Sequence, residues 1–240
     1  MAENKSLKAA VPLEKPWSFY GENGELRGLA VSYFRVLSEE LDTPITVHAV
    51  PAKRLIHGIE MGYYDLTLMF ADQAQDGAVS IVAPVLKLDK VLVGLKGLDI
   101  KNRQDIEGLR MAFVRGASSG SWIDNNQRIK KITTSNYRES LWLLKQKRVD
   151  AITGSYPVLE NILTKHDMSW DDLNRPYLLS CRFVLLMFSN LSKHYSQFKA
   201  VQVTALKMKK GQKWEALLRE VSEVAPSMLA QHNHEKFLSY

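Results

Sequence analysis

Two short segments of the chain combine glycine, hydroxyl and basic residues in a pattern that could bind an anion. The first, Arg115-Gly-Ala-Ser-Ser-Gly120, precedes a helix that we expect to begin near Trp122. Backbone N–H groups at the start of a helix attract negative charge, and serine hydroxyls add further donors. The second, Gly154-Ser-Tyr156, precedes Pro157, which favours the first turn of a helix. The candidate ligand contacts here are Arg115, Ser118, Ser119, Ser155 and Tyr156.

The N-terminal half offers aromatic side chains and one arginine. Trp17 and Phe70 could form stacking walls for a ring or an alkyl chain, or could simply pack in the core. Arg54 follows Pro51 at a predicted helix start, where its guanidinium could bind a carboxylate or a phosphate. The alternative for Arg54 is a surface pair with a nearby acid. Three residues at strand ends and turns complete the candidate set: Tyr20, Met69 and Asp72.

Metal and catalytic chemistry find little support in the residue pattern. The six histidines are dispersed, and His232-Asn-His234 lacks a third ligand. The one cysteine, Cys181, lies in an apolar run without an evident histidine partner, so we expect a buried, inert thiol. The serines at 118, 119 and 121 have no assignable base. We expect no catalytic residue, no metal and no cofactor.

A repeated pattern indicates which elements position the candidates. Segments 55–70 and 140–154 each contain an apolar helical stripe, a tight polar turn, an aspartate and a short apolar run. Their aspartates, Asp65 and Asp150, are 85 positions apart (150 minus 65). A helix followed by a buried strand is one step of an α/β winding, so two such steps predict two α/β lobes. Two lobes form a cleft for a small ligand. We interpret both aspartates as turn and strand-entry residues.

The predicted fold class is therefore α/β, with two lobes joined by two crossover strands. Lobe 1 is expected to comprise residues 1–96 and 184–240, and lobe 2 to be inserted at residues 97–183. We expect a first strand over residues 7–20, a strand over 90–95, and a long apolar strand over 178–188 that returns to the first lobe.

Composition limits the classes of partner. The 240 residues carry a net charge of +6, with 45% apolar and 24% charged residues, as in an ordinary globular protein. The basic residues are scattered, and the main cluster, residues 207–213, has the pattern of a solvated helix face. No zinc ligand set, arginine-rich run or aromatic RNA-binding signature is present, which argues against nucleic acid. No stretch reaches the roughly 20 apolar residues of a membrane-spanning helix.

Four segments in order resemble the bacterial extracellular solute-binding proteins of family 3, which have the type II periplasmic binding protein fold. They are Trp17–Gly28, Pro51–Asp65, Asp105–Gly116 and Lys147–Ile152. The resemblance implies a non-enzymatic, monomeric periplasmic protein that closes by a hinge on a small polar or aromatic metabolite. It implies an ABC transporter permease or a membrane sensor as the partner. The first residues lack an apolar signal core, so either the protein is cytoplasmic or a signal peptide has been removed.

The same resemblance bears on the ligand. Amino-acid-binding members bind the α-carboxylate with an arginine after the first repeated strand, and the ammonium with an aspartate at the end of the second. In this chain, counting from Asp65 and Asp150 places Gly77 and Ser155 at these positions. No Arg or Lys lies between Phe70 and Lys87. The absence of both charged anchors argues against an ordinary α-amino acid ligand.

Two other functions stay open at this point. Relatives similar to cyclohexadienyl dehydratase catalyse eliminations in the same cleft, and Glu160 and Asp72 are the nearby acids that could act as general acid or base. A degenerate member could instead bind a protein partner through one lobe.

Overall fold

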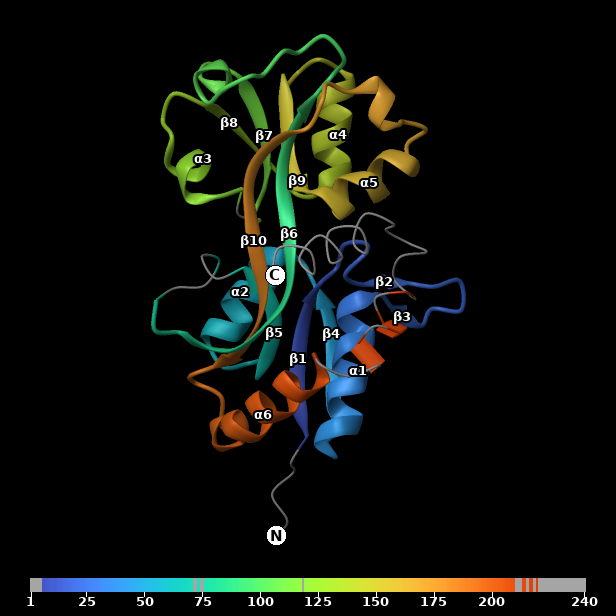
Figure 1. The fold of residues 1–240 in the computed structure, drawn as a ribbon, viewed down its shortest axis with the longest axis vertical. Helices are drawn as coiled ribbons and strands as arrows, with labels where there is room; N and C mark the ends of the chain where they lie inside the picture. The colour runs from blue at the N-terminus through green and yellow to red at the C-terminus, as the bar shows by residue number, and fades with distance from the viewer. Residues whose placement is uncertain are drawn as a thin grey trace, which may run out of the picture. The chain divides into compact units, whose positions relative to one another are not determined.

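The computed structural model describes residues 6–70, 73, 76–117, 119–209, 213, 214, 216, 217 and 219. The chain divides into two compact units: unit 1 comprises Met1–Leu86 and Phe183–Tyr240, and unit 2 comprises Lys87–Arg182. Each unit alternates strands and helices, which confirms the predicted α/β class (Figure 1). The unit boundaries lie inside two long strands, whereas the boundary predicted after residue 96 lies beyond the end of the first of them.

Unit 1 is a sheet with helices on both faces. Its elements are β1 (Leu7–Pro12), β2 (Phe19–Tyr20), β3 (Leu26–Arg27), α1 (Leu29–Leu41), β4 (Ile45–Val50), α2 (Ala52–Glu60), β5 (Leu66–Phe70) and α6 (Phe198–Met208), with a 3-10 turn at Tyr195–Gln197. Strand β1 pairs in parallel with β4 and β5. Apolar residues of α2 pack against β1, β5 and the returning strand, whereas α1 contacts α6 and β4.

Unit 2 repeats this plan on a smaller scale. Its elements are β7 (Arg110–Val114), α3 (Ser121–Asn125), β8 (Lys130–Thr134), α4 (Tyr137–Lys145), β9 (Ala151–Ser155) and α5 (Tyr156–Thr164), with 3-10 turns at Gln104–Ile106 and Trp170–Asp172. Strand β7 pairs in parallel with β8 and β9. A core cluster that includes Leu92, Met111 and Ile123 fills one face of this sheet. In this unit, α4 packs on β7 and β9 and also contacts α5.

Two long strands connect the units, β6 (Val79–Gly94) and β10 (Tyr177–Ser189). The strand order β4-β1-β5-β10-β6-β9-β7-β8 makes them neighbours (Figure 1). The prediction for β10 was close, whereas the strand predicted over 90–95 was too short. Pro84, Lys87 and Asp89 interrupt its apolar pattern. Of β6, only Lys90–Gly94 pair with β9. Pro84 lies before this paired part, so its missing N–H costs no hydrogen bond to β9.

The first strand was predicted too long. Strand β1 ends at Pro12, which cannot donate to a further ladder position. The Ser18 hydroxyl donates to the Pro12 carbonyl at 2.7 Å, and this bond folds the chain into a turn before β2. Phe19 and Tyr20 then form a separate two-stranded sheet with β3.

The repeated aspartates make equivalent hydrogen bonds in the two units. Asp65 donates its N–H to the Lys8 carbonyl at 2.8 Å, and its Oδ2 accepts the Lys8 N–H at 2.7 Å. Asp150 donates to the Arg110 carbonyl at 2.7 Å, and its Oδ2 accepts the Arg110 N–H at 2.8 Å. Each aspartate therefore joins the start of one strand to its parallel neighbour, which confirms the strand-entry interpretation.

Helix ends repeat as well. Gly62 and Lys147, also 85 positions apart (147 minus 62), both adopt left-handed backbone just after α2 and α4, with φ of 72° and 55°. Helices commonly end on such a residue. Among the described residues, no helix is both long and apolar enough to cross a bilayer.

Candidate functional site

The candidates of unit 2 gather at one edge of its sheet. Strands β7 and β9 are parallel neighbours, so their carboxyl ends share an edge. The loop after β7, residues 115–120, and the junction of β9 with α5 at Ser155 and Tyr156 therefore belong to one site. Ligands of open α/β sheets bind outside such carboxyl ends.

Buried hydroxyl groups line this edge. Ser119 and Thr153 are 4% and 5% exposed, and their hydroxyl oxygens share a very short hydrogen bond. This bond joins the loop after β7 to strand β9, so the loop is held against the sheet. Ser155 is 2% exposed, and its side chain makes no capping hydrogen bond to α5. The Ser155 hydroxyl therefore does not cap α5.

The glycine-serine loop differs from a simple anion-binding helix start. The N–H groups of Ser119 and Gly120 both donate to the Asp124 carboxylate at 3.2 Å. Asp124 lies in α3, which is only five residues long. An internal carboxylate thus occupies the donors that we expected to face an anion. The side chains of this edge, and not these two N–H groups, are left for a ligand.

A lysine that we had not predicted lies directly beside Ser155. Lys90 of β6 is paired with Ser155 of β9 in antiparallel register. Directly opposite residues of an antiparallel pair project from the same face of the sheet. Lys90 is only 4% exposed, which is unusual for a lysine. The sheet edge therefore has a buried lysine side chain next to Ser155.

Ser180 of β10 adds another hydroxyl that we had missed. Its Oγ is buried and has no hydrogen-bond partner in the described part of the chain. A Cβ placed on Gly120 would lie 3.6 Å from this oxygen, so Ser180 faces the loop after β7. A buried hydroxyl without a partner is uncommon and is often satisfied by a bound water or ligand.

Tyr156 lies at the rim of the same edge. Its ring stacks on Trp170, with centroids 4.3 Å apart and an interplanar angle of 23°. Partial burial, and secondarily the negative charge of Glu160, raise the pKa of the Tyr156 hydroxyl above its usual range. The phenol is thus a neutral donor at physiological pH and is a poor general base.

In unit 1 the predicted aromatic candidates are buried. Trp17 and Phe70 are each 7% exposed, and Met69 belongs to the core cluster under α2. The Trp17 carbonyl accepts the Ala30 N–H at 3.0 Å and lies 2.5 Å from where a Cβ on Gly28 would be. The segment around Trp17 is therefore fixed against the start of α1. The Phe70 N–H donates to the Gln73 side chain at 2.9 Å.

The other predicted contacts are exposed or lie outside the described residues. Tyr20 is 60% exposed on the small β2-β3 sheet. Arg54 and Arg115 are exposed, and neither guanidinium bonds to a protein group in the described part of the chain. The surface ion pair considered as an alternative for Arg54 is therefore not formed there. Asp72 and Ser118 lie outside the described residues.

Gly77 lies in a turn that carries no cation. Its φ of 79° is left-handed, and its carbonyl accepts the Asn190 side-chain N–H at 2.8 Å. The turn is thus tied to the end of β10 by an amide, at the place where counting along the chain would put the arginine of amino-acid binders.

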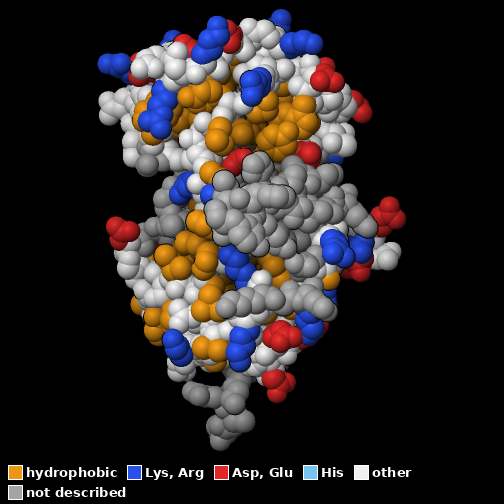
Figure 2. Space-filling view, in the orientation of Figure 1, with side chains coloured by type: hydrophobic (Ala, Val, Ile, Leu, Met, Phe, Trp, Pro, Cys, Tyr) orange, Lys and Arg blue, Asp and Glu red, His pale blue; other side chains and the backbone are white. Residues whose placement is uncertain are grey.

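Metal and thiol chemistry can be judged from the described residues. No group of three His, Cys, Asp or Glu side chains in them could hold a metal ion. The prediction for Cys181 was wrong, because this cysteine is exposed. It lies on β10, whose residues alternate between exposed and partly covered at this point. His232 and His234 lie outside the described residues. The scattered distribution of Lys and Arg is visible on the face shown in Figure 2.

Sequence reasoning missed Lys90, Thr153 and Ser180, although each left a signal. Lys90 lies inside β6 directly before the apolar run Val91-Leu-Val93, and a charged side chain in a buried part of a strand requires a polar environment. Ser180 and Thr153 are hydroxyl residues within apolar strands. The pairing that brings Lys90 opposite Ser155 depends on strand register, which the sequence alone does not provide.

Of three comparisons with known proteins, the one with solved structures gives matches, and these support the fold. No family model matches this chain, and no curated protein matches it. Among solved structures, an ancestral arginine-binding protein bound to arginine is 16% identical, with a TM-score of 0.75, over 90% of this chain and 97% of that one.

Two further solved structures extend this likeness. An arginine transport system periplasmic binding protein from Legionella pneumophila is 14% identical, with a TM-score of 0.74, over 90% of this chain and 99% of that one. A solute receptor for L-cysteine of Neisseria gonorrhoeae is 15% identical, with a TM-score of 0.73, over 90% and 89%. These neighbours are binding proteins. The chain therefore has the two-lobed α/β fold of the periplasmic solute-binding proteins.

Proposed function

We propose that this protein is a non-enzymatic solute-binding protein whose ligand is a small polar or aromatic metabolite with an anionic group. The fold supports a solute-binding role, and the buried Lys90 opposite Ser155 supports the charge of the ligand. The ligand is thus not an ordinary α-amino acid. The partner is an ABC transporter permease or a membrane sensor, and the protein acts as a periplasmic monomer.

The position of Lys90 determines which ligand charge this edge favours. An ammonium from an amino acid placed beside Ser155 would meet the Lys90 ammonium, and like charges at about 4 Å repel by roughly 4 kcal/mol near a protein surface. A carboxylate or phosphate at the same place would gain a charge-assisted hydrogen bond. Lysine has three N–H donors, so Lys90 can serve a ligand in addition to a protein partner.

The other residues that we propose to contact the ligand come from both units. In unit 2, Ser119, Ser155, Tyr156 and Arg115 supply hydroxyl and guanidinium donors, and Ser118 completes the loop. In unit 1, the proposed contacts are Trp17, Tyr20, Arg54, Met69, Phe70 and Asp72. Among these, Arg54 and Arg115 have guanidinium groups that the described part of the chain leaves without a protein partner.

A thermal-shift screen tests the ligand class. Small carboxylates, aromatic acids and phosphorylated metabolites are compared with the twenty amino acids at matched concentrations. A ligand present at 100 times its Kd stabilises the folded state by about 2.7 kcal/mol, which raises the melting temperature measurably. We expect shifts from anions without an ammonium group. A screen in which only amino acids shift the melting temperature would contradict the proposal.

Lys90→Gln tests the observation that carries the proposal. This variant keeps a polar side chain of similar length but removes the charge, so the affinity for an anionic hit should fall about tenfold or more. Lys96→Gln is the matched control, because Lys96 is an exposed lysine of the same unit. Calorimetric titration of both variants measures the difference. Equal affinity in both would assign the anion to another residue.

Turnover assays separate this proposal from the enzyme alternative. Glu160 and Asp72 would have to act as acid and base, and Glu160 lies close enough to Tyr156 to influence its pKa. Consumption of prephenate or arogenate by the purified protein, lost in Glu160→Gln, would establish a catalytic function. We expect no turnover.

A further inference from the structure

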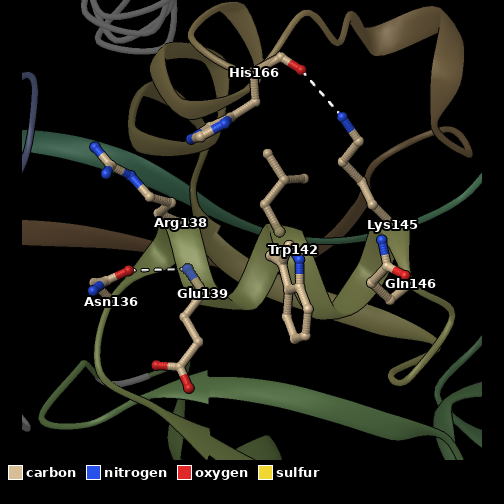
Figure 3. A pocket seen from close by; sticks show the side chains of 8 residues that line it. Asn136, Arg138, Glu139, Trp142, Lys145, Gln146 and His166 are labelled. Atoms are coloured by element: carbon tan, nitrogen blue, oxygen red, sulfur yellow. Dashed lines mark hydrogen bonds between the residues drawn. The ribbon is translucent and has the colours of Figure 1, made fainter.

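Unit 2 carries a hollow beside helix α4, away from the sheet edge described above. Its volume is about 580 Å³, within the range of small-ligand pockets. It is lined by Asn136, Arg138, Glu139, Leu141, Trp142, Lys145, Gln146 and His166. All of these belong to α4, its two ends, or the turn after α5, so this hollow is formed entirely within one unit (Figure 3). None of them is at the sheet edge described above.

Helical spacing aligns two cations with an aromatic ring. Arg138, Trp142 and Lys145 lie four and then three positions apart, so they share one face of α4. Tyr137, Leu141 and Leu144 of the helix are buried, and Leu141 also lines the hollow. In Figure 3 Arg138 and Lys145 lie on opposite sides of the hollow, with Trp142 between them on the helix.

Trp142 is the aromatic wall of this hollow. It is 48% exposed, which is unusual for the largest apolar side chain of a helix. The guanidinium carbon of Arg148 lies 5.0 Å from the centre of its ring, so a third cation is close to the indole. An exposed aromatic face can stack the ring of a flat ligand, and neighbouring cations favour a ligand that also has an anionic group.

The lining of the hollow carries two cationic side chains, Arg138 and Lys145, and one carboxylate, Glu139. The carboxylate of Glu139 already accepts the Ser135 N–H at 2.7 Å, and Asn136 Oδ1 accepts the Glu139 N–H at 2.9 Å. These two side chains cap the start of α4. Lys145 donates to the His166 carbonyl at 3.3 Å, which leaves two further donors on its ammonium. Arg138 makes no side-chain bond in the described part of the chain.

His166 gives an independent sign that something binds here. Its Nε2 atom is buried and has no hydrogen-bond partner among the described residues. Buried ring nitrogens of this kind normally have a partner. Figure 3 shows the imidazole at the hollow, on the side of Arg138. Because this nitrogen has almost no surface open to the hollow, the imidazole must turn before a ligand oxygen can bond to it.

The equivalent helix of unit 1 lacks these features. The repeat of 85 positions relates Arg138, Trp142 and Lys145 to Lys53, His57 and Glu60 of α2. That helix face has no tryptophan, and one cation is replaced by an acid. The hollow is thus a property of unit 2 and not of the repeated architecture.

We propose that this hollow is a second ligand site, specific for a small aromatic carboxylate. The ring of the ligand stacks beside Trp142, its carboxylate pairs with Arg138 and Lys145, and His166 Nε2 supplies a further hydrogen bond. The site is independent of the solute site proposed at Ser155 and Lys90, so either proposal can fail without the other.

Titration of the full chain with 2-naphthoate tests the site. The indole N–H signals of the five tryptophans are followed by NMR, and Trp142 is assigned from Trp142→Phe. We expect naphthoate to move the Trp142 signal in a saturable way. The cation 2-naphthylmethylammonium, which has the same ring system, should bind at least tenfold more weakly because Arg138, Lys145 and Arg148 repel it.

Variants decide which side chains bind the probe. Arg138→Gln combined with Lys145→Gln should weaken naphthoate binding roughly tenfold, and His166→Ala roughly threefold. The control Lys53→Gln, at the equivalent place of unit 1, should leave the affinity unchanged. A Trp142 signal that naphthoate does not move, equal binding of the cation, or equal loss in Lys53→Gln would each overturn the proposal. Arg138 and Trp142 lie on the surface, and melting curves verify that the variants fold.

Discussion

Two aspartates, Asp65 and Asp150, make the same pair of backbone hydrogen bonds in different surroundings. The side chain of Asp65 is 6% exposed and also binds the Ser192 hydroxyl and the His194 ring. The side chain of Asp150 is 32% exposed and pairs with the Arg110 guanidinium, Nη2 to Oδ1 at 2.7 Å. Because the two aspartates make the same backbone hydrogen bonds but differ in burial, we expect them to contribute unequally to the stability of the protein.

Asp65→Ala should destabilise the protein more than Asp150→Ala. Removing the Asp65 carboxylate leaves the Lys8 N–H and the Ser192 hydroxyl without a partner in a buried place, at a cost of about 2–4 kcal/mol. The groups left by Asp150→Ala can be reached by water, and the expected loss is about 1 kcal/mol. Urea unfolding of both variants measures the two losses. Equal losses would contradict the role that we assign to burial.

Acid should weaken the Asp150 contribution. Hydrogen bonds from the Arg110 side chain, followed by its backbone N–H and its charge, lower the pKa of Asp150 below its usual range. A carboxyl with a lowered folded-state pKa stabilises the protein above its unfolded pKa of about 3.9, and this stabilisation disappears as pH falls through the folded pKa. The pair is partly exposed, so the effect is below about 1 kcal/mol. The difference in unfolding free energy between wild type and Asp150→Asn should shrink from pH 7 to pH 3; a constant difference would exclude this linkage.

For single residues, the sequence predicted which side chains lie at the sheet edge better than it predicted their hydrogen-bond partners. It predicted Ser155 and Ser119 at the sheet edge, where they are found. It did not predict that Asp124 bonds to the loop N–H groups, because a carboxylate five positions from a serine has many possible partners. It did not predict the exposure of Cys181, since an apolar run shows hydrophobicity but not which face is covered.

Helix ends show the same repetition at the scale of elements. Gly62 and Lys147 both end a helix in left-handed backbone, but only Gly62 is sterically constrained: a Cβ there would lie 2.6 Å from the Leu191 carbonyl oxygen. The αL conformation costs a residue with a side chain about 1–2 kcal/mol.

Gly62→Ala and Lys147→Gly should therefore act in opposite directions. We expect Gly62→Ala to destabilise by about 2–3 kcal/mol, because strain and a backbone contact add. Lys147→Gly relieves the strain and should stabilise by roughly 0.5–1 kcal/mol. Thermal unfolding of the two variants decides this. A stabilising Gly62→Ala would mean that the turn can move away from Leu191.

Most elements were predictable, and the errors have local causes. Pro157 placed the start of α5 within one residue. Pro12 shortened the first strand. The first part of β6 was not predicted, because Pro84 and charged residues interrupt its apolar pattern. A period-two pattern is lost where the pairing of a strand changes along its length.

For the molecule as a whole, the repeat predicted two α/β units, and the comparisons support this fold. Counting from the repeated aspartates also predicted that both charged anchors of the amino-acid binders are absent. Counting could not predict that Lys90 lies opposite Ser155. Lys90 is 65 residues before Ser155 (155 minus 90), and only the antiparallel register of β6 and β9 brings the two together. The sequence thus argued against one ligand class, and the register suggests another.

The adjacency of β6 and β10 has a consequence for synthesis of the protein. Unit 2 is one continuous segment, whereas unit 1 is interrupted by it and is completed only from Phe183 onward. When the chain emerges from its N-terminus, β5 lacks its neighbour β10 and the apolar face of α1 lacks α6 until all of unit 2 has emerged. An open strand edge and a bare helix face make an incompletely folded chain prone to aggregate. The N-terminal third of this chain is therefore the part most prone to aggregate before residues from Phe183 onward are available.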